Sequence, residues 1–356
     1  MTSASRRSYG GTYVALIVFL AAAVIASMCV GAFMFTPGRI ASFTAQQAGW
    51  SAIVDADSLS RNVFFQLRLP RVLIAGLVGA VLGVSGTLMQ GLFRNPIVEP
   101  GLAGTSAGAA LGAALVFVLG AGTIASFTTL VGTFAVPLLA FAGAFTATAI
   151  VYRISASFGK VNVFTLLLAG IAINAVCAAG TGFLSYIARD PQARNITFWN
   201  LGTFTTADWR SVSIVAPAFI LCFGFALRSG KALNALMLGE DEAALLGVAS
   251  DKLVWRLLLV NTVMVAAATA MVGVIAFVGL IVPHLLRMLR SSDYTFLLPA
   301  SALLGAEIME SVDVVARVII TPAELPVGII TAIVGAPVFL WILLRQQRQG
   351  SSGFYG

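Results

Sequence analysis

Long stretches without any Asp, Glu, Lys or Arg are the feature of this sequence that most limits its fold. Each such charge costs about 2.5 to 3.5 kcal/mol at the centre of a membrane-spanning helix. Only 10% of the 356 residues are charged and 59% are hydrophobic, which excludes a soluble globular enzyme and a disordered chain. The sequence therefore predicts an all-α polytopic membrane protein. The charge-free stretches are Gly10–Gly38, Val72–Phe93, Pro100–Tyr152, Val161–Ala188, Ser211–Leu227, Leu257–His284, Tyr294–Ala306 and Leu325–Leu344.

The third and sixth stretches are each interpreted as two helices, because one helix spans a bilayer with about 20 residues. Residues 120–127 are rich in Gly, Ser and Thr and divide the third stretch with a turn. Two basic residues precede the sixth stretch and two follow it, and the positive-inside rule places both pairs in the cytoplasm only if the chain crosses twice. We therefore predict an outer turn near Gly273 and a short helix that ends near Pro283. The basic residues are Lys252, Arg256, Arg287 and Arg290.

The sequence thus predicts ten membrane-spanning helices in a single domain, residues 1–356, with both termini in the cytoplasm. Arg6 and Arg7, which precede the first stretch, favour a cytoplasmic N-terminus. On this topology the cytoplasmic segments contain 13 basic and 6 acidic residues and the outer segments 8 of each, out of the 21 and 14 in the chain. The whole net charge of +7 then falls on the inner face, so the basic composition does not indicate a nucleic-acid partner.

Few residues of the sequence are suited to catalysis. Cys29, Cys177 and Cys222 lie in apolar runs, where they pack as small hydrophobic residues and indicate neither a disulfide framework nor a metal cluster. The single histidine, His284, follows Pro283, and an interfacial structural role explains it better than catalysis or metal ligation. The Gly-Lys pairs lack the other residues of a phosphate-binding loop. We therefore expect a chain that is not an enzyme, binds no metal or cofactor itself, and depends on a partner for any use of ATP.

Three acidic residues begin a short helix in the predicted cytoplasmic loop 229–252. Acidic side chains stabilise a helix N-terminus, and a glycine ends the segment. This helix either lies on the bilayer surface or places its apolar pair in a groove of a partner protein. Anionic lipid would repel the acidic residues, which favours the groove. The segment consists of Glu240, Asp241, Glu242, Ala243, Ala244, Leu245, Leu246 and Gly247.

Three arginines mark the predicted outer face. Arg68 and Arg71 open the second membrane span, and Arg317 is expected just after the ninth. Their long side chains either extend to the membrane interface or form a basic patch for acidic groups of an external partner. The residue pattern alone leaves both explanations open.

Four charged residues near the ninth span are expected on one helix face. Glu307, Glu310, Asp313 and Arg317 are spaced by three, three and four residues. Charges this close to a membrane rarely face lipid. An internal pair of Asp313 with Arg317 is the structural interpretation and a polar lining of a substrate route is the functional one, and the spacing favours neither.

Close helix packing is indicated by Gly-x-x-x-Gly pairs, which let two backbones approach inside a membrane. They occur at Gly79 and Gly83, and in the overlapping series of Gly104, Gly108 and Gly112.

Six segments of the sequence are long enough to compare with known families. They are RLPR at 68–71, SGTLMQGLFRNPIVEPGLAGTSAGAALG at 85–112, GEDEAALLGV at 239–248, GVIAFVGLIVPHLLR at 273–287, LLPASALLGA at 297–306 and PAELPVGIITAIVGAPVFLWILL at 322–344. In wording and order they resemble the permease subunits of type II ABC importers for iron-siderophores, haem and vitamin B12, the FecCD-like family. The resemblance covers nearly the whole chain after the first helix.

The resemblance implies the type II importer permease fold: a ten-helix subunit of the bacterial inner membrane, paired with a second copy. Two separate ATPase subunits, which bind ATP and Mg, would dock on the cytoplasmic side, and a periplasmic substrate-binding protein on the outer side. The helix around Glu240 to Gly247 would be the coupling helix that sits in the ATPase groove. Arg68, Arg71 and Arg317 would meet carboxylates of the binding protein.

The same resemblance implies that the translocation route lies between the two copies. The fifth and tenth helices would line it, with Ala172, Asn174 and Gly335 as candidate residues. Transport would proceed by alternating access. Glu307 and Glu310 depart from the apolar or small residues usual in the ninth helix of the family, so the packing of that helix is not transferred from it.

The segment NPIVEPGLAGTSAGAALGAAL looks most similar to haem-importing members, so haem is the expected cargo, with a ferric siderophore or cobalamin as the alternative. A stand-alone secondary transporter is the alternative from another class. Such proteins usually have charges at the membrane midplane, whereas the central spans here are almost bare of charge.

Overall fold

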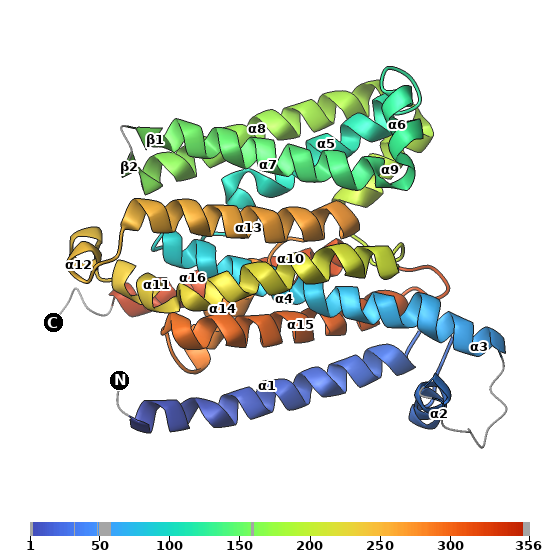
Figure 1. The fold of residues 1–356 in the computed structure, drawn as a ribbon, viewed down its shortest axis with the longest axis horizontal. Helices are drawn as coiled ribbons and strands as arrows, with labels where there is room; N and C mark the ends of the chain where they lie inside the picture. Colours follow the sequence, from blue (N-terminus) through green and yellow to red (C-terminus); the bar gives the residue numbers. More distant parts are fainter. Residues whose placement is uncertain (1–2, 32, 48, 50–57, 158–159, 352–356) are drawn as a thin grey trace.

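Helices that run along one long axis make up nearly the whole molecule (Figure 1). The structure is a computed structural model and describes residues 3–31, 33–47, 49, 58–157 and 160–351 of the 356. The short helix α12 (Glu240–Leu245) marks one end, called here the α12 end. Helix α1 (Ser3–Cys29) begins at this end, whereas α2 (Pro37–Gln47) lies at the opposite end.

The main helices of the described chain follow the ten predicted spans in order. Among the described residues, seven helical stretches are long and apolar enough to cross a membrane, and α5, α14 and the segment Val327–Trp341 of α16 are shorter apolar segments. The chain is therefore a multi-pass, all-helical membrane protein. Besides α1, the main helices are α4 (Leu69–Leu92), α5 (Thr105–Leu119), α7 (Ala135–Ser155), α8 (Val163–Ile187), α10 (Trp209–Arg228), α13 (Ser250–Val272), α14 (Val278–Leu289), α15 (Tyr294–Val318) and α16 (Val327–Ser351).

Short elements connect these helices at the two ends. Within the described residues, the strands are limited to a hairpin of two residues on each side, in which Ala156 pairs with Val161. The connecting elements are α3 (Ser58–Val63), the π-helical turn η1 (Phe64–Arg68), the 3-10 turns η2 (Pro100–Ala103) and η3 (Gly132–Phe134), α6 (Ala125–Val131), α9 (Asp190–Asn200), α11 (Gly230–Leu236), β1 (Ala156–Ser157) and β2 (Lys160–Val161).

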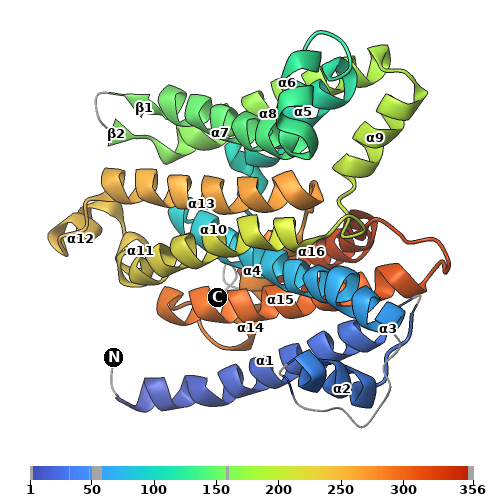
Figure 2. The same cartoon turned by 45° about the vertical axis from the view of Figure 1, so that its right-hand side comes forward.

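Helix α4 is the centre of the bundle. It contacts α10, α13, α14 and α15, and Ile74, Val81 and Leu88 on it are fully buried. Apolar side chains all round a helix are expected where other helices cover it on every side. Figure 2 shows α5, α7 and α8 grouped on one side of α13, and α1 along the opposite side of the bundle. Most of the apolar surface of α1 and α8 is exposed, as expected for helices that face lipid or another subunit.

The predicted glycine contacts are confirmed. A Cβ at Gly79 would overlap the carbonyl of Gly305 in α15, and one at Gly112 would overlap the carbonyl of Leu139 in α7. These crossings bring helix backbones into direct contact, which is how helices associate where no hydrophobic force acts between them. Gly104 is required for another reason, because its φ of 91° lies in the left-handed region that favours glycine.

The helix at the predicted ninth span is longer than predicted. The absence of charge ended the predicted stretch at Ala306, but α15 continues as one helix of 25 residues to Val318. Arg317 therefore lies in the last turn of α15 and not after the span. The prediction failed because α15 turns its charged face into the protein, where Asp313 and Arg317 form an ion pair.

Other predicted boundaries also require correction. The first span was expected to reach Gly38, but α1 ends at Cys29 and the separate helix α2 follows. The predicted turn at residues 120–127 is present, although α6 and η3 intervene before α7 begins at Ala135. The predicted break at Gly273 is confirmed, whereas the eighth span does not end near Pro283, which lies inside α14.

Candidate functional site

Helix α12 begins at Glu240, as predicted, and ends at Leu245, two residues before the predicted terminal glycine. Gly239 precedes it with a φ of 136°, and the three acidic residues occupy its first turn, where the helix dipole favours negative charge. At the other end Gly247 has a φ of 81°. The amide of Val248 donates to Ala243 O at 2.9 Å and the amide of Gly247 donates to Ala244 O at 2.9 Å, which is the Schellman arrangement for ending a helix.

The two leucines of this segment point away from the rest of the chain. Ala243 is completely buried, on the side of α12 that faces the rest of the chain, while Leu245 is 88% and Leu246 is 64% exposed. The preceding Leu238 is also exposed. Apolar side chains displayed on a short, acidic helix at one end of a membrane protein suit insertion into a groove of another protein.

One polar contact fixes α12 to the loop after α4, and another joins α11, which contacts α12, to the start of α15. Arg94, in the loop after α4, donates to Glu240 at 2.6 Å, and because both side chains are exposed this pair fixes position more than it adds stability. Nearby, the side chain of Asn234 in α11 donates to Asp293 at 2.7 Å. Burial raises the pKa of Asp293, but hydrogen bonds from Asn234 and Thr295 outweigh it, so this pKa lies below its ordinary value.

The three predicted docking arginines come together at the opposite end of the molecule. Arg68, Arg71 and Arg317 line one hollow of about 210 Å³, beside Glu324 of the loop before α16. Arg71 bridges two carboxylates, with Asp313 at 2.8 Å and Glu324 at 2.9 Å. The side chain of Glu324 is 29% exposed, whereas that of Asp313 is fully buried.

Arg68 and Arg317 also stabilise the end of α1. Both guanidinium groups donate to the carbonyl of Val30, and Arg317 donates further to Ser27 O at 3.0 Å. The Ser27 carbonyl lies in the last turn of α1 and that of Val30 directly after it, where cations are favourable and unpaired acceptors need donors. Both side chains are buried, so they are structural groups of this chain whatever else they contact.

The pairing predicted as the structural interpretation of α15 is confirmed. Asp313 and Arg317 form an ion pair at 3.0 Å, one helical turn apart. Glu310 is buried on the same face and Glu307 is half-buried. Asp313 thus contacts two guanidinium groups, which compensates for the cost of burying its charge.

One of the predicted route residues lines a hollow of about 410 Å³. Asn174 of α8 lies there with Glu99 and Asn200, and residues 274–276 between α13 and α14 form another wall. The amide of Asn174 donates to Gly101 O at 3.2 Å, whereas its Oδ1 is buried without a hydrogen-bond partner among the described residues. Glu99 accepts from the amide of Phe277 at 2.9 Å and so holds the break between the two helices.

The other two route residues lie apart from this hollow. Ala172 is exposed on the outward surface of α8. Gly335 is buried where α16 crosses Phe277, and a Cβ there would meet the Phe277 side chain. Phe277 itself has a φ of 68°, which is rare for a residue other than glycine, so this region of backbone is strained.

Two residues of these sites, Glu99 and Glu324, were not predicted. Glu99 lay inside a quoted segment, and a carboxylate directly before an apolar stretch was the available signal. Glu324 has the same signal, since it directly precedes the stretch Leu325–Leu344, but its place beside Arg71 depends on a contact between residues 253 positions apart. Among the described residues, no group of three or more His, Cys, Asp or Glu is placed to bind a metal ion.

The chain is similar in sequence and in structure to known transport proteins. The model of the FecCD transport family matches residues 18–345. The chain is 39% identical to the hemin transport system permease protein HmuU of Yersinia pestis over 339 residues, 94% of this chain and 96% of that protein. It is 37% identical to the vitamin B12 import system permease protein BtuC of Klebsiella pneumoniae, covering 97% and 96%. The solved structure of a metal-chelate type ABC transporter in an inward-facing conformation is 32% identical, with a TM-score of 0.81, covering 95% of this chain and all of that one.

Proposed function

The chain belongs to the FecCD transport family of ABC importer permeases, and from that premise we propose that it moves haem across the bacterial inner membrane by alternating access. The observation that carries this proposal is the match over residues 18–345 together with the exposed leucines of α12. Permease subunits of this family serve haem, vitamin B12 or iron chelates and are not themselves catalytic. ATP and Mg are assigned to a separate ATPase subunit.

We propose that the chain crosses the membrane ten times as a single domain, with the α12 end in the cytoplasm. The elements at that end bear most of the basic residues, which agrees with the positive-inside rule. Helix α16 then crosses as well, and so do the shorter helices α5 and α14, because short helices can span where neighbouring segments complete the distance. Both termini are cytoplasmic on this topology.

The α12 segment is the proposed contact with the ATPase subunits. Glu240, Asp241 and Glu242 would lie at the rim of the ATPase groove, and Leu245 and Leu246 inside it. Ala243 and Gly247 have supporting roles, because one packs beneath the helix and the other ends it. ATP-driven movement of the ATPase pair would be transmitted through this contact to the helices.

The hollow lined by Arg68, Arg71 and Arg317 is the proposed docking point for a periplasmic binding protein. A carboxylate of that protein would enter beside Arg71 and replace the partly exposed Glu324. Arg68 and Arg317 would add positive potential from fixed positions. Charge complementarity of this kind favours fast and specific encounter more than high affinity.

The translocation route is proposed to run between two copies of the chain, related by a twofold axis as in most homodimers. The exposed surface of α8 around Ala172 would face the route, and the unpartnered Oδ1 of Asn174 offers an acceptor near it. Gly335 would contribute by allowing α16 to lie against Phe277. A route with few strong ligands suits a large cargo that must be released.

Transport in proteoliposomes tests the proposal. The chain reconstituted with its ATPase subunit and binding protein should accumulate haem only when ATP is present. Haem accumulation by the chain alone would contradict it and support a secondary transporter. Cargo identity is tested by stimulation of ATP turnover, which should be greatest with the haem-loaded binding protein. Greater stimulation by a ferric siderophore or cobalamin would reassign the cargo without changing the class of protein.

A further inference from the structure

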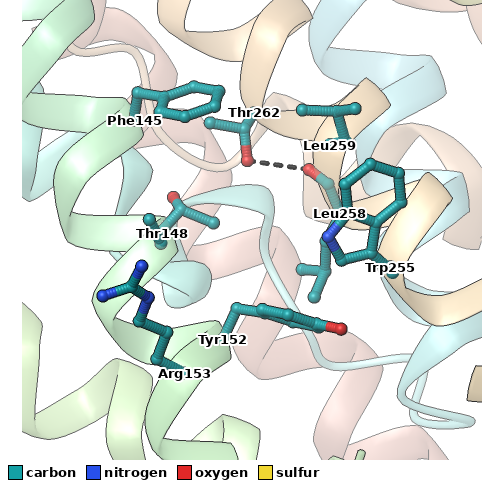
Figure 3. Close-up of a pocket in the computed structure, with 9 residues that line it drawn as sticks. Phe145, Thr148, Tyr152, Arg153, Trp255, Leu258, Leu259 and Thr262 are labelled. Carbon is teal, nitrogen blue, oxygen red and sulfur yellow. Dashed lines mark hydrogen bonds between the residues drawn. The ribbon is translucent and has the colours of Figure 1, made fainter. Parts of the chain in front are cut away.

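A crevice of about 310 Å³ lies between α7 and α13, near the α12 end (Figure 3). Its size is at the lower end of the range of ligand pockets, about 300 to 1,000 Å³. The proposed function makes no use of it. Its lining consists of Phe145, Thr148, Ala149, Tyr152, Arg153, Trp255, Leu258, Leu259 and Thr262.

The interior of the crevice is apolar in effect, because its hydroxyl groups already have partners. Thr262 donates to Leu258 O of its own helix at 2.7 Å, the dashed line in Figure 3. The hydroxyl of Thr148 lies 3.2 Å from that of Thr105 in α5. A polar ligand placed here would lose hydrogen bonds to water and gain few, so the interior suits a hydrocarbon chain.

The mouth of the crevice is basic. A second hollow of about 420 Å³ shares Tyr152 and Trp255 with it and is also lined by Asp251, Lys252 and Arg256. The carboxylate of Asp251 accepts from the amide of Val161 at 2.8 Å and is held by that contact.

Three cations surround this mouth. Arg153, Lys252 and Arg256 are exposed, and none of them forms a hydrogen bond or ion pair with another described residue of the chain. These three cations outnumber the one carboxylate of the mouth, that of Asp251, which already accepts a hydrogen bond from Val161. The mouth of the apolar crevice therefore has an excess of positive charge.

We propose that this crevice binds an anionic phospholipid, with an acyl chain between α7 and α13 and the phosphate at Arg153, Lys252 and Arg256. Basic pockets between membrane helices on one face of the bilayer are known to hold acidic head groups. Tyr152 and Trp255 at the mouth are the side chains that favour the head-group level.

The depth of the crevice distinguishes a lipid from an acidic partner protein. Phe145 lies about two turns before Arg153 on α7, about 12 Å along the helix axis. The lining thus extends from the basic mouth into the apolar part of both helices, as a lipid does and a protein docked on the α12 end does not.

Native mass spectrometry of the purified full-length chain tests this assignment. The probes are phosphatidylglycerol and phosphatidylcholine with identical acyl chains. The wild-type chain should retain more phosphatidylglycerol, and the double variant Arg153→Gln/Arg256→Gln should reduce that retention at least severalfold while retention of phosphatidylcholine stays constant. The matched control is Arg228→Gln/Lys231→Gln, which removes two exposed cations from α10 and α11 away from the crevice.

Either of two results would overturn the assignment. One is equal retention of the two lipids by the wild-type chain, which would indicate ordinary contact with the bilayer. The other is an equal effect of the control variant, which would indicate general surface charge.

A second pair of variants tests the acyl chain. Ala149→Leu fills the crevice and should reduce retention of both lipids, whereas Ala149→Ser leaves its volume nearly unchanged and should retain them. Because these changes do not alter charge, full retention by Ala149→Leu would exclude the crevice as the acyl site. Both outcomes are independent of cargo and of the ATPase.

Discussion

Replacing Leu245 and Leu246 by alanine should separate the permease from its ATPase subunit without disturbing the membrane fold. The two side chains are 88% and 64% exposed in the isolated chain, so they contribute little to its stability. Whatever they contribute to an assembly comes from burial in the partner. The effect of the double variant can therefore be worked out from the exposed fractions.

Full burial of a leucine side chain is worth about 1.5 to 3 kcal/mol. Scaled by the exposed fractions of 88% and 64%, burial of the pair contributes about 2 to 5 kcal/mol to each contact. Since 1.4 kcal/mol corresponds to about a factor of ten, the ATPase subunit should bind roughly 50- to 2,000-fold more weakly. Alanine keeps one methyl group, which places the expected value in the lower half of this range.

The assay is equilibrium binding of the ATPase subunit to the full-length permease in nanodiscs. Leu130→Ala/Ile319→Ala is the matched control, because these residues are 85% and 60% exposed. They lie on α6 and directly after α15, at the end away from α12. Unchanged ATPase affinity for the α12 variant would refute the coupling assignment, and so would an equal loss in the control.

Three further predictions concern charged groups. Asp313→Asn leaves Arg317 buried without its counter-ion, and losing one partner of a buried pair costs about 3 to 5 kcal/mol. The midpoint of thermal unfolding in detergent should therefore shift to clearly lower temperature, and an unchanged midpoint would contradict the pairing. Glu324→Gln frees Arg71 for an incoming carboxylate and should tighten binding-protein docking in a salt-sensitive way, whereas Asp190→Asn at the same end should not. The pKa of Asp293 lies below its ordinary value of 3.8, so the ionised carboxylate stabilises the fold above that pH, and this stabilisation is lost as the pH falls through the folded-state pKa. Asp293→Asn should remove this part of the loss of stability in acid. Identical profiles of stability against pH for the variant and the wild-type chain would contradict the prediction.

Much of the fold follows from the sequence, because the cost of burying a charge in a membrane is large and local. The charge-free stretches located the main helices, and the positive-inside rule located the break at Gly273 that length alone left ambiguous. Helix α9, by contrast, was not predicted. It lies at the opposite end from α12, where water satisfies backbone groups and the apolar pattern gives no signal.

The candidate sites were predictable to different degrees. The α12 segment depends on neighbouring residues only, so its acidic first turn and terminal glycine were sufficient to define it. The hollow lined by Arg68, Arg71 and Arg317 depends on contacts between distant segments. The sequence identified Arg71 but not Glu324, and it could not show that Arg68 and Arg317 share the carbonyl of Val30.

The main failure and the main success of the sequence analysis have the same physical cause. An unpaired charge is excluded from the membrane, which is why charge-free stretches mark spans. Once a carboxylate and a guanidinium meet inside the bundle, their mutual attraction offsets much of that cost, and a charged turn can then continue a membrane helix. Asp313, placed between Arg71 and Arg317, is such a case, and it lets α15 extend twelve residues beyond Ala306 to Val318. Of these two partners, Arg317 could be predicted from the spacing within α15, whereas Arg71 belongs to α4 and its place depends on how the two helices pack.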